Sequence, residues 1–263
     1  MIDYTISTHE IEYFLLIFVR IASFIFSAAF FSTKGVPRQP KIALSIFISY
    51  LMYTNIYPHE YPSYSTILGY GTLVLKEAAV GLIIGVGTQL CTSIVLFAGR
   101  IMDMEIGLSM ANVFDPSTQQ QASVTGMLIQ YGVLIILYIS GLHRYLIKAL
   151  METYELIPVC GAVINTDKLL QTFADFLSNY IVIGFRICLP VFASITLMNI
   201  VLGLLAKLAP QMNMFSVGIQ LKLLAGLVVL LFTVQLLPTV CNFITTQIQQ
   251  MMVSIVEGLM PPV

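Results

Sequence analysis

Charged residues are scarce in this chain of 263 residues: they make up 10% of it, where a soluble domain has about a quarter. Hydrophobic residues reach 58%, and the mean hydropathy is +0.91. This composition excludes an ordinary water-soluble domain. The formal net charge of −1, without a cluster of Lys and Arg, also excludes a nucleic-acid-binding surface, which needs positive charge on one face. We therefore expect a membrane protein that binds no nucleic acid.

Cysteine and histidine are also scarce: the chain has four cysteines and three histidines. The cysteines lie far apart in apolar surroundings, without the close pairs of metal sites and redox motifs, so we expect buried thiols that pack as small hydrophobes. The three histidines do not form an HExxH motif, and the chain has neither a GxSxG elbow nor a phosphate-binding glycine loop with Lys. The sequence thus predicts no catalytic residue, no metal site, no cofactor and no enzyme activity. The four cysteines are Cys91, Cys160, Cys188 and Cys241, and the three histidines are His9, His59 and His143.

Long uncharged stretches take up much of the chain. Residues 187–206, at a helical rise of 1.5 Å per residue, are long enough to cross a hydrocarbon layer of roughly 30 Å. The stretches predict an all-α fold with about six hydrophobic helices. They cover residues 42–58, 78–99, 116–142, 187–206 and 223–256, and the apolar run at residues 11–31, which contains Glu12 and Arg20, completes the six.

The stretch at residues 187–206 ends in a predicted hairpin turn. Lys207 stops the apolar run, Pro210 cannot continue a helix, and Gln211 and Asn213 suit a polar turn. A second apolar run begins at Phe215. The pattern predicts two long hydrophobic helices joined as a hairpin, although an ordinary membrane hairpin would have the same spacing.

Five charged side chains lie inside or against apolar runs, where an unpaired charge costs several kcal/mol in lipid. Because Lys76 and Glu77 are adjacent, they point about 100° apart on a helix, which favours ion pairs with other helices or other subunits. A local pair with water access at a helix end is the alternative. Gly81 and Gly85 have the spacing that lets two helix backbones approach closely. The five charged residues are Arg20, Lys76, Glu77, Arg186 and Lys222.

Residues 99–125 differ from a plain loop between two membrane helices. Met102, Met104 and Met110 lie among apolar residues, and methionine fills irregular gaps because it is flexible. The segment could be a deformable seal, or the methionines could simply fill the core. At its end Asp115 and Pro116 have the residue types of a helix start, with a carboxylate to cap free amides and a proline in the first turn.

The C-terminal segment predicts an amphipathic helix. Apolar residues recur there at spacings of three and four, and glutamines occupy much of the other face. Because the polar face carries little charge, we expect this helix to pack on a neighbouring protein rather than bind anionic lipid. Its apolar face comprises Ile244, Ile248, Met251, Ile255 and Leu259.

Four motifs, in order, carry a resemblance to a known family. They are GVPRQPKIALS at residues 35–45, IGLSMANVFDP at 106–116, SGLHRYLI at 140–147 and NIVLGLLAKLAPQMNMF at 199–215. Over nearly its whole length the chain resembles the FliR family of flagellar and type III secretion export proteins. The FDP and LAPQMN wording favours the flagellar branch, and an injectisome homologue is the alternative. A secondary transporter of six helices remains the less favoured reading.

The resemblance implies a core subunit of the flagellar export gate in the bacterial inner membrane, within the flagellar basal body. Kinked helical hairpins would pack in a hetero-oligomeric helical assembly with FliP-like and FliQ-like subunits, together with FlhB-like and FlhA-like components. The single domain, residues 1–263, would divide into a FliP-like part, about 1–178, and a FliQ-like C-terminal hairpin and helix, about 179–263. Unfolded flagellar subunits would pass through the channel.

In this family one loop acts as the plug of the closed channel. The resemblance places it here at Met110, Ala111, Asn112, Val113, Phe114, Asp115, Pro116, Ser117, Thr118, Gln119, Gln120 and Gln121. The chain also departs from the family pattern. Gly218, Ile219, Gln220 and Leu221 replace the usual Gly-Phe-Pro-Leu, and Glu105 and Ile106 stand where Gln and Met are common.

Overall fold

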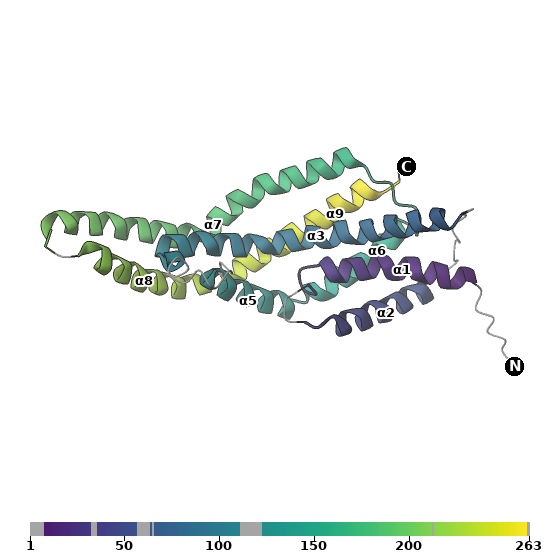
Figure 1. The fold of residues 1–263 in the computed structure, drawn as a ribbon, viewed down its shortest axis with the longest axis horizontal. Coiled ribbons are helices and arrows are strands. Elements are labelled where there is room, and N and C mark those ends of the chain that lie inside the picture. Colours follow the sequence, from purple (N-terminus) through teal and green to yellow (C-terminus); the bar gives the residue numbers. More distant parts are fainter. Residues whose placement is uncertain are drawn as a thin grey trace. The chain divides into compact units, whose positions relative to one another are not determined.

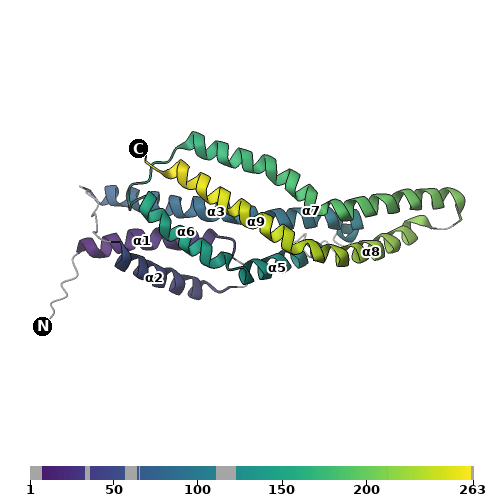
Figure 2. The same cartoon turned by 180° about the vertical axis from the view of Figure 1, so that it is seen from behind.

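The computed structural model describes residues 8–32, 36–56, 64, 66–110, 123–211 and 213–261. Every regular element in these ranges is a helix, which confirms the predicted all-α class (Figures 1 and 2). The elements are α1 (Thr8–Ser27), α2 (Arg38–Asn55), α3 (Ile67–Ile106), the 3₁₀ turn η1 (Leu108–Met110), α5 (Val124–Ile139), α6 (Leu142–Leu156), α7 (Thr166–Leu208), α8 (Met214–Thr233), the 3₁₀ turn η2 (Val234–Leu236) and α9 (Leu237–Leu259).

The chain forms two compact units, each discontinuous in sequence. Unit 1 comprises Met1–Cys91, Gly141–Phe176 and Thr246–Val263, and unit 2 comprises Thr92–Ser140 and Leu177–Thr245. Helices α3, α7 and α9 contribute residues to both units. The expected division near residue 178 into FliP-like and FliQ-like parts stays a prediction.

Unit 1 is built around α1. This helix packs beside α2 in both ribbon views (Figures 1 and 2). Leu16, Ile17, Ile21 and Phe24 of α1 are fully buried, so the helix contributes a continuous apolar stripe to the core of the unit.

Helix α5 begins and ends at other residues than those predicted. Ser123 has an extended backbone, and its hydroxyl oxygen accepts a hydrogen bond from the Gly126 amide at 2.9 Å, so it caps a helix that starts at Val124. At the other end α5 stops at Ile139, and Gly141 adopts a left-handed conformation with φ 81°. The prediction of one continuous helix over residues 116–142 is therefore wrong, because Ser123 and Gly141 interrupt it, while the predicted start at Pro116 lies outside the described residues.

Helix α6, Leu142–Leu156, was missed by the sequence analysis. The helices were predicted from uncharged stretches, and α6 is not one of them because it carries Arg144, Lys148 and Glu152 on its exposed side. Its apolar face is nevertheless regular, because Leu142, Leu146 and Leu150 recur every four residues and are buried.

The most apolar helices are long enough to cross a membrane. Among the described residues these are Ile67–Ile106, Thr166–Leu208 and Ser216–Leu259, and a fourth span is formed if α5 and α6, bent by 66°, count together. Helix α7 runs through Pro190 as one element, whereas the predicted helix at residues 223–256 is interrupted by η2.

The amphipathic C-terminal helix is confirmed, but its cover is different from the one expected. All five predicted apolar positions are buried, and all of them except Met251 are completely so. Within unit 1, Met251 and Ile255 lie against Gly87 of α3, and the Asn165 amide donates to the Gly258 carbonyl at 3.0 Å. The expectation that a neighbouring protein covers this face is wrong, because the same chain already covers it.

Candidate functional site

A buried ion pair joins α1 to α3 in unit 1. The Arg20 Nε donates to Glu77 Oε2, and the Arg20 Nη2 donates to Glu77 Oε1 at 2.9 Å. Both side chains are 0% exposed. Two parallel N–H···O bonds give the fork geometry that makes Arg the best partner for a carboxylate. This pair lies between two helices of one chain, so neither charge needs another subunit.

The remaining donors of Arg20 are used by the turn after α6. Nη1 donates to the Ile157 carbonyl at 2.9 Å and Nη2 to the Pro158 carbonyl at 3.3 Å. The Arg20 Cζ lies 4.3 Å from the centre of the Tyr154 ring, and the Tyr154 hydroxyl donates to the Ile17 carbonyl at 3.2 Å. A buried charge is tolerated only when its hydrogen bonds are made, and Arg20 makes them to Glu77 of α3 and to two carbonyls of the turn after α6.

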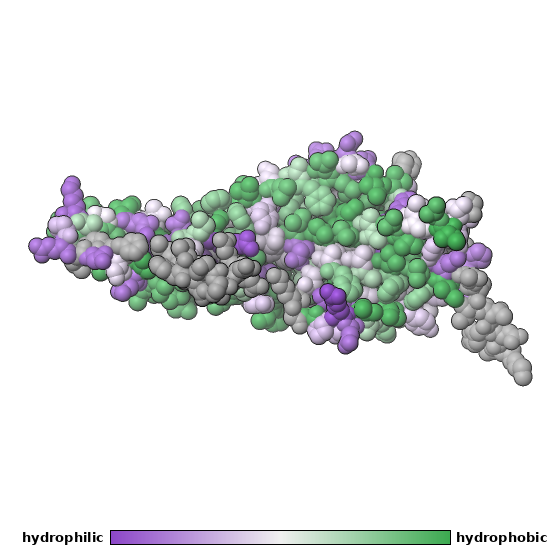
Figure 3. All heavy atoms as spheres, viewed as in Figure 1, coloured by the Kyte–Doolittle hydropathy of each residue, from purple (hydrophilic) through white to green (hydrophobic). Residues whose placement is uncertain are grey.

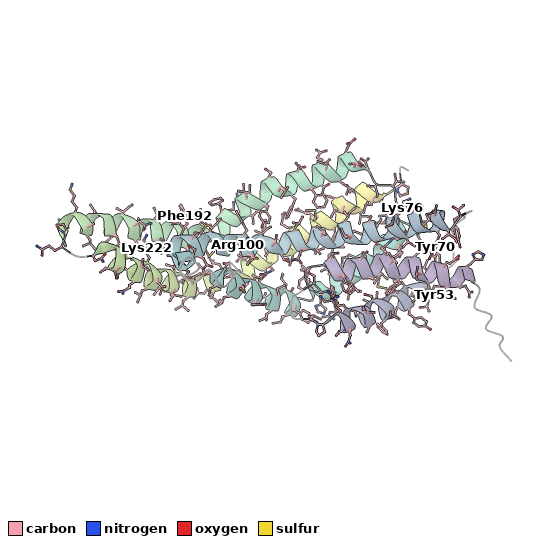
Figure 4. The ribbon with its side chains drawn as sticks, viewed as in Figure 1. Tyr53, Tyr70, Lys76, Arg100, Phe192 and Lys222 are labelled. Atoms are coloured by element: carbon pink, nitrogen blue, oxygen red, sulfur yellow. The ribbon has the colours of Figure 1, made fainter. Side chains whose placement is uncertain are left out.

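Cys160 connects this cluster to Lys76. Its amide donates to Glu77 Oε1 at 2.8 Å, and its carbonyl accepts from Lys76 Nζ at 3.1 Å. Adjacent residues of α3 thus hold the two sides of one loop residue (Figure 4 shows Lys76 on α3). Cys160 has φ 68°, a left-handed conformation that favours glycine.

The Cys160 thiol is not poised for reaction. Burial, and to a smaller degree the Glu77 carboxylate, raises the pKa of this thiol to about 11. It therefore stays protonated near neutral pH, where the thiolate would be the reactive form. Cys91, Cys188 and Cys241 are buried as expected, and all four thiols are free.

Two glycines bring the helices close enough for the ion pair to form. A Cβ atom at Gly81 would overlap the Arg20 carbonyl oxygen and Ser23 Oγ, and one at Gly85 would overlap Ser27 Oγ. The predicted close approach at this pair of glycines is confirmed, and α1 is the helix that approaches.

The other two singled-out charges lie in unit 2 and are unpaired among the described residues. Arg186 is exposed on α7. Lys222, labelled in Figure 4, is half-buried on α8. Neither forms a hydrogen bond or an ion pair with any residue that the structure describes.

The segment predicted as a plug, Met110 to Gln121, lies outside the described residues except for the Met110 backbone, and so do Asp115 and Pro116. Its flanks belong to unit 2. Asp103 is 5% exposed, and its Oδ1 accepts from the Thr125 amide at 3.2 Å. A Cβ atom at Gly99 would overlap the Gly126 backbone, so α3 and α5 meet closely where the segment leaves and re-enters. Sequence analysis did not single out Asp103, although an Asp flanked by apolar residues was the available signal.

The predicted hairpin turn joins α7 to α8. Lys207 lies in the last turn of α7, and Pro210 and Gln211 follow the helix end at Leu208. The Asn213 side chain accepts from the Ser216 amide at 3.4 Å and so caps α8.

The helices of this hairpin expose a large apolar surface. Only 17% of the most apolar window of Thr166–Leu208 is buried, and 6% of that of Ser216–Leu259, against 56% for α3. Hydrophobic side chains also gather over much of the face in Figure 3, including over α7. Such a surface needs lipid or another protein against it. The strongly exposed residues include Leu189, Leu197, Ile200, Leu204, Leu208, Leu224, Leu231 and Phe232.

Long apolar helices joined as hairpins, with a buried charge pair inside the chain, define an all-α membrane protein. Comparison with known proteins then identifies the family: residues 11–248 match the model of bacterial export proteins, family 1, and the chain belongs to that family. It is 30% identical to the flagellar biosynthetic protein FliR of Bacillus subtilis over 83% of this chain and 84% of that protein.

Two further relatives carry the same name. The chain is 25% identical to the FliR protein of Escherichia coli, covering 92% of this chain and 91% of the relative. It is 28% identical to that of Aquifex aeolicus, with 85% of each chain covered. The predicted resemblance to the FliR family is confirmed, and the chain is a membrane component of the flagellar export apparatus.

Proposed function

We propose that this protein is a subunit of the flagellar export gate that helps form the channel for unfolded flagellar subunits in the bacterial inner membrane. FliP-like and FliQ-like subunits are its direct partners, and FlhB-like and FlhA-like components act beside them. The protein serves as a structural part of the channel and not as an enzyme. Energy for export comes from other components.

The observation that carries the proposal is the exposed apolar surface of the α7–α8 hairpin, in a chain that belongs to the family of bacterial export proteins. Unit 1 satisfies its buried charges internally, yet α7 and α8 leave most of their apolar residues exposed. Lipid could cover them, but Lys222 lies within α8 without a partner among the described residues, and a charge facing lipid is costly. Partner subunits that cover the apolar residues and offer Lys222 a counter-charge or a hydrogen-bond acceptor would account for both features.

The base of the segment at residues 111–122 supports a plug within that channel. Asp103 and Thr125 are hydrogen-bonded, and Gly99 and Gly126 are in close contact, so both flanks are held together. A loop with a fixed base can change conformation without unpacking α3 from α5. Met102, Met104 and Met110 lie just before this segment, and their flexible side chains suit a seal whose contacts must change shape.

The binding partners are tested by co-expression. The chain made alone is expected to be poorly stable in mild detergent, whereas co-expression with FliP-like and FliQ-like subunits is expected to give one tight complex. Mass measurement of the extracted species distinguishes the two. A stable, monodisperse monomer that gains nothing from the partners contradicts the export-gate proposal.

The plug is tested by shortening residues 111–121 in the assembled complex. The subunit composition of the complex should be unchanged, while the membrane conductance of cells expressing the shortened form should rise. Removal of the four residues 260–263, which follow α9, serves as a control. Unchanged conductance with normal assembly contradicts the plug and leaves the partner proposal standing.

The transporter alternative loses its main support. A transporter needs a substrate site, and the adjacent charges Lys76 and Glu77 would be its best candidates. Glu77, however, is occupied by Arg20 and the Cys160 amide, and Lys76 binds the Cys160 carbonyl. An injectisome role is separated from a flagellar one by gene neighbourhood, since adjacent genes for the hook and basal body would decide for the flagellum.

A further inference from the structure

A hollow in unit 2 contains one charged group in an apolar lining. Its volume is about 270 Å³, close to the lower end of small-ligand pockets, which begin at about 300 Å³. Helices α3, α5, α7 and α9 contribute to it. Arg186 is the charged residue, and the other lining residues include Met102, Ile129, Pro190, Leu237, Val240 and Phe243.

Arg186 is available to a ligand. It is exposed and forms no hydrogen bond or ion pair with the described residues. Thr233, which also lines the hollow, already donates its hydroxyl hydrogen to the Leu230 carbonyl at 2.8 Å. The guanidinium is therefore the main free donor, and a ligand that satisfies it must bring an anion.

The position of Arg186 on α7 indicates where that anion comes from. Residues 187–206 are uncharged and lie between Arg186 and Lys207, and their length of about 30 Å matches the hydrocarbon layer. With this run in the membrane, both cations reach the headgroup level, where such side chains are stable. The apolar hollow then opens beside Arg186 at the same depth.

We propose that this hollow binds an anionic phospholipid, with the phosphate on the Arg186 guanidinium and part of one acyl chain among Met102, Ile129 and Phe243. The volume admits part of one chain and not a whole lipid. A carboxylate of a partner protein is the competing occupant, and the experiment distinguishes it.

The test measures lipid retained by the full chain, purified in mild detergent, by native mass spectrometry. Dioleoyl phosphatidylglycerol is compared with dioleoylglycerol, which has the same acyl chains and no phosphate. We expect the anionic lipid to bind about tenfold more tightly, the factor that corresponds to one charge-assisted hydrogen bond. Arg186→Gln should remove this preference and Arg186→Lys should keep most of it. Arg100→Gln removes an exposed cation of unit 2 outside the hollow and should change nothing.

A second variant tests the apolar part. Val240→Phe places a larger side chain in the lining and should weaken both lipids equally, without affecting the preference between them. If Arg186→Gln fails to fold, Val240→Phe still tests the proposal. Equal binding of the two lipids by the unaltered chain overturns the proposal. So does an Arg186→Gln chain that keeps its lipid preference but loses its partner subunits in co-expression, because the cation would then face a protein carboxylate.

Discussion

Glu77 holds three parts of unit 1 together. One carboxylate accepts from the guanidinium of Arg20 on α1 and from the amide of Cys160 after α6, while the backbone of Glu77 belongs to α3. The pair is completely buried, and the turn carbonyls use the remaining Arg20 donors. Removing either charge would leave the other without water and without its partner.

Glu77→Ala should therefore destabilise the chain by about 3–5 kcal/mol, the usual cost of leaving one member of a buried ion pair. The double variant Arg20→Met with Glu77→Leu should lose less, because no buried charge remains. Denaturant titration of the detergent-solubilised chain measures the free energy of unfolding. A double variant as unstable as the sum of the single ones would contradict a direct coupling of the two charges.

Cys160 is predicted to be held in a strained backbone conformation. Its φ of 68° costs a residue with a Cβ atom about 1 kcal/mol relative to glycine. Cys160→Gly should therefore be about 1 kcal/mol more stable than Cys160→Ala, which removes the same thiol and keeps the Cβ atom. The midpoints of thermal unfolding of the two variants provide the comparison, and an Ala variant as stable as the Gly variant would argue against strain at this position.

At the scale of elements, the contact between α1 and α3 depends on the absence of side chains. A methyl group at Gly81 would overlap a carbonyl oxygen of α1, and backbone cannot move aside as a flexible side chain does. The contact also sets the register of Arg20 and Glu77. Local helix preference would favour alanine at either glycine, so packing overrides propensity here.

Gly81→Ala should lower the thermal unfolding midpoint of the full chain. Gly71→Ala on the same helix is the matched control, because nothing lies within 4 Å of the added methyl group. This control should be stabilised by about 0.5–1 kcal/mol, the usual gain from replacing a glycine inside a helix. Gains of similar size at both positions would mean that α1 and α3 are not in close contact.

At the scale of the whole molecule, burial is uneven. The core of unit 1 includes fully buried side chains from α1, α3 and α9, whereas little of α8 is covered by its own chain. Helices with few buried contacts open more often than those in a core, so the two regions should respond differently to partners.

Hydrogen exchange should show this difference. In a complex with FliP-like and FliQ-like subunits, amides of α8 should exchange about tenfold more slowly than in the chain alone, which corresponds to about 1.4 kcal/mol of added protection. Amides of α1 should be unchanged and act as the internal control. Equal slowing of α1 and α8 would indicate that the partners stabilise the whole fold and do not cover the hairpin in particular.

The sequence by itself determined the class, the long apolar helices and the family. Those properties follow from composition, from uncharged runs of membrane length and from ordered motifs, all of which are local or additive. The hairpin turn between α7 and α8, at Pro210, Gln211 and Asn213, is local in the same way. The apolar stripe of α9 was readable too, because it depends on a period of 3.6 residues and not on what covers it.

Only the tertiary structure decided which charges pair and which faces are covered. Arg20 and Glu77 are 57 positions apart, and no local pattern connects them. Their contact depends on the close approach of α1 at Gly81. It also depends on the turn after α6, a helix that the uncharged stretches of the sequence do not reveal. The cover of α9 by α3 and the hollow at Arg186 likewise arise from residues far apart in the chain. A linear pattern shows that a side chain needs a partner, and three-dimensional packing selects the partner.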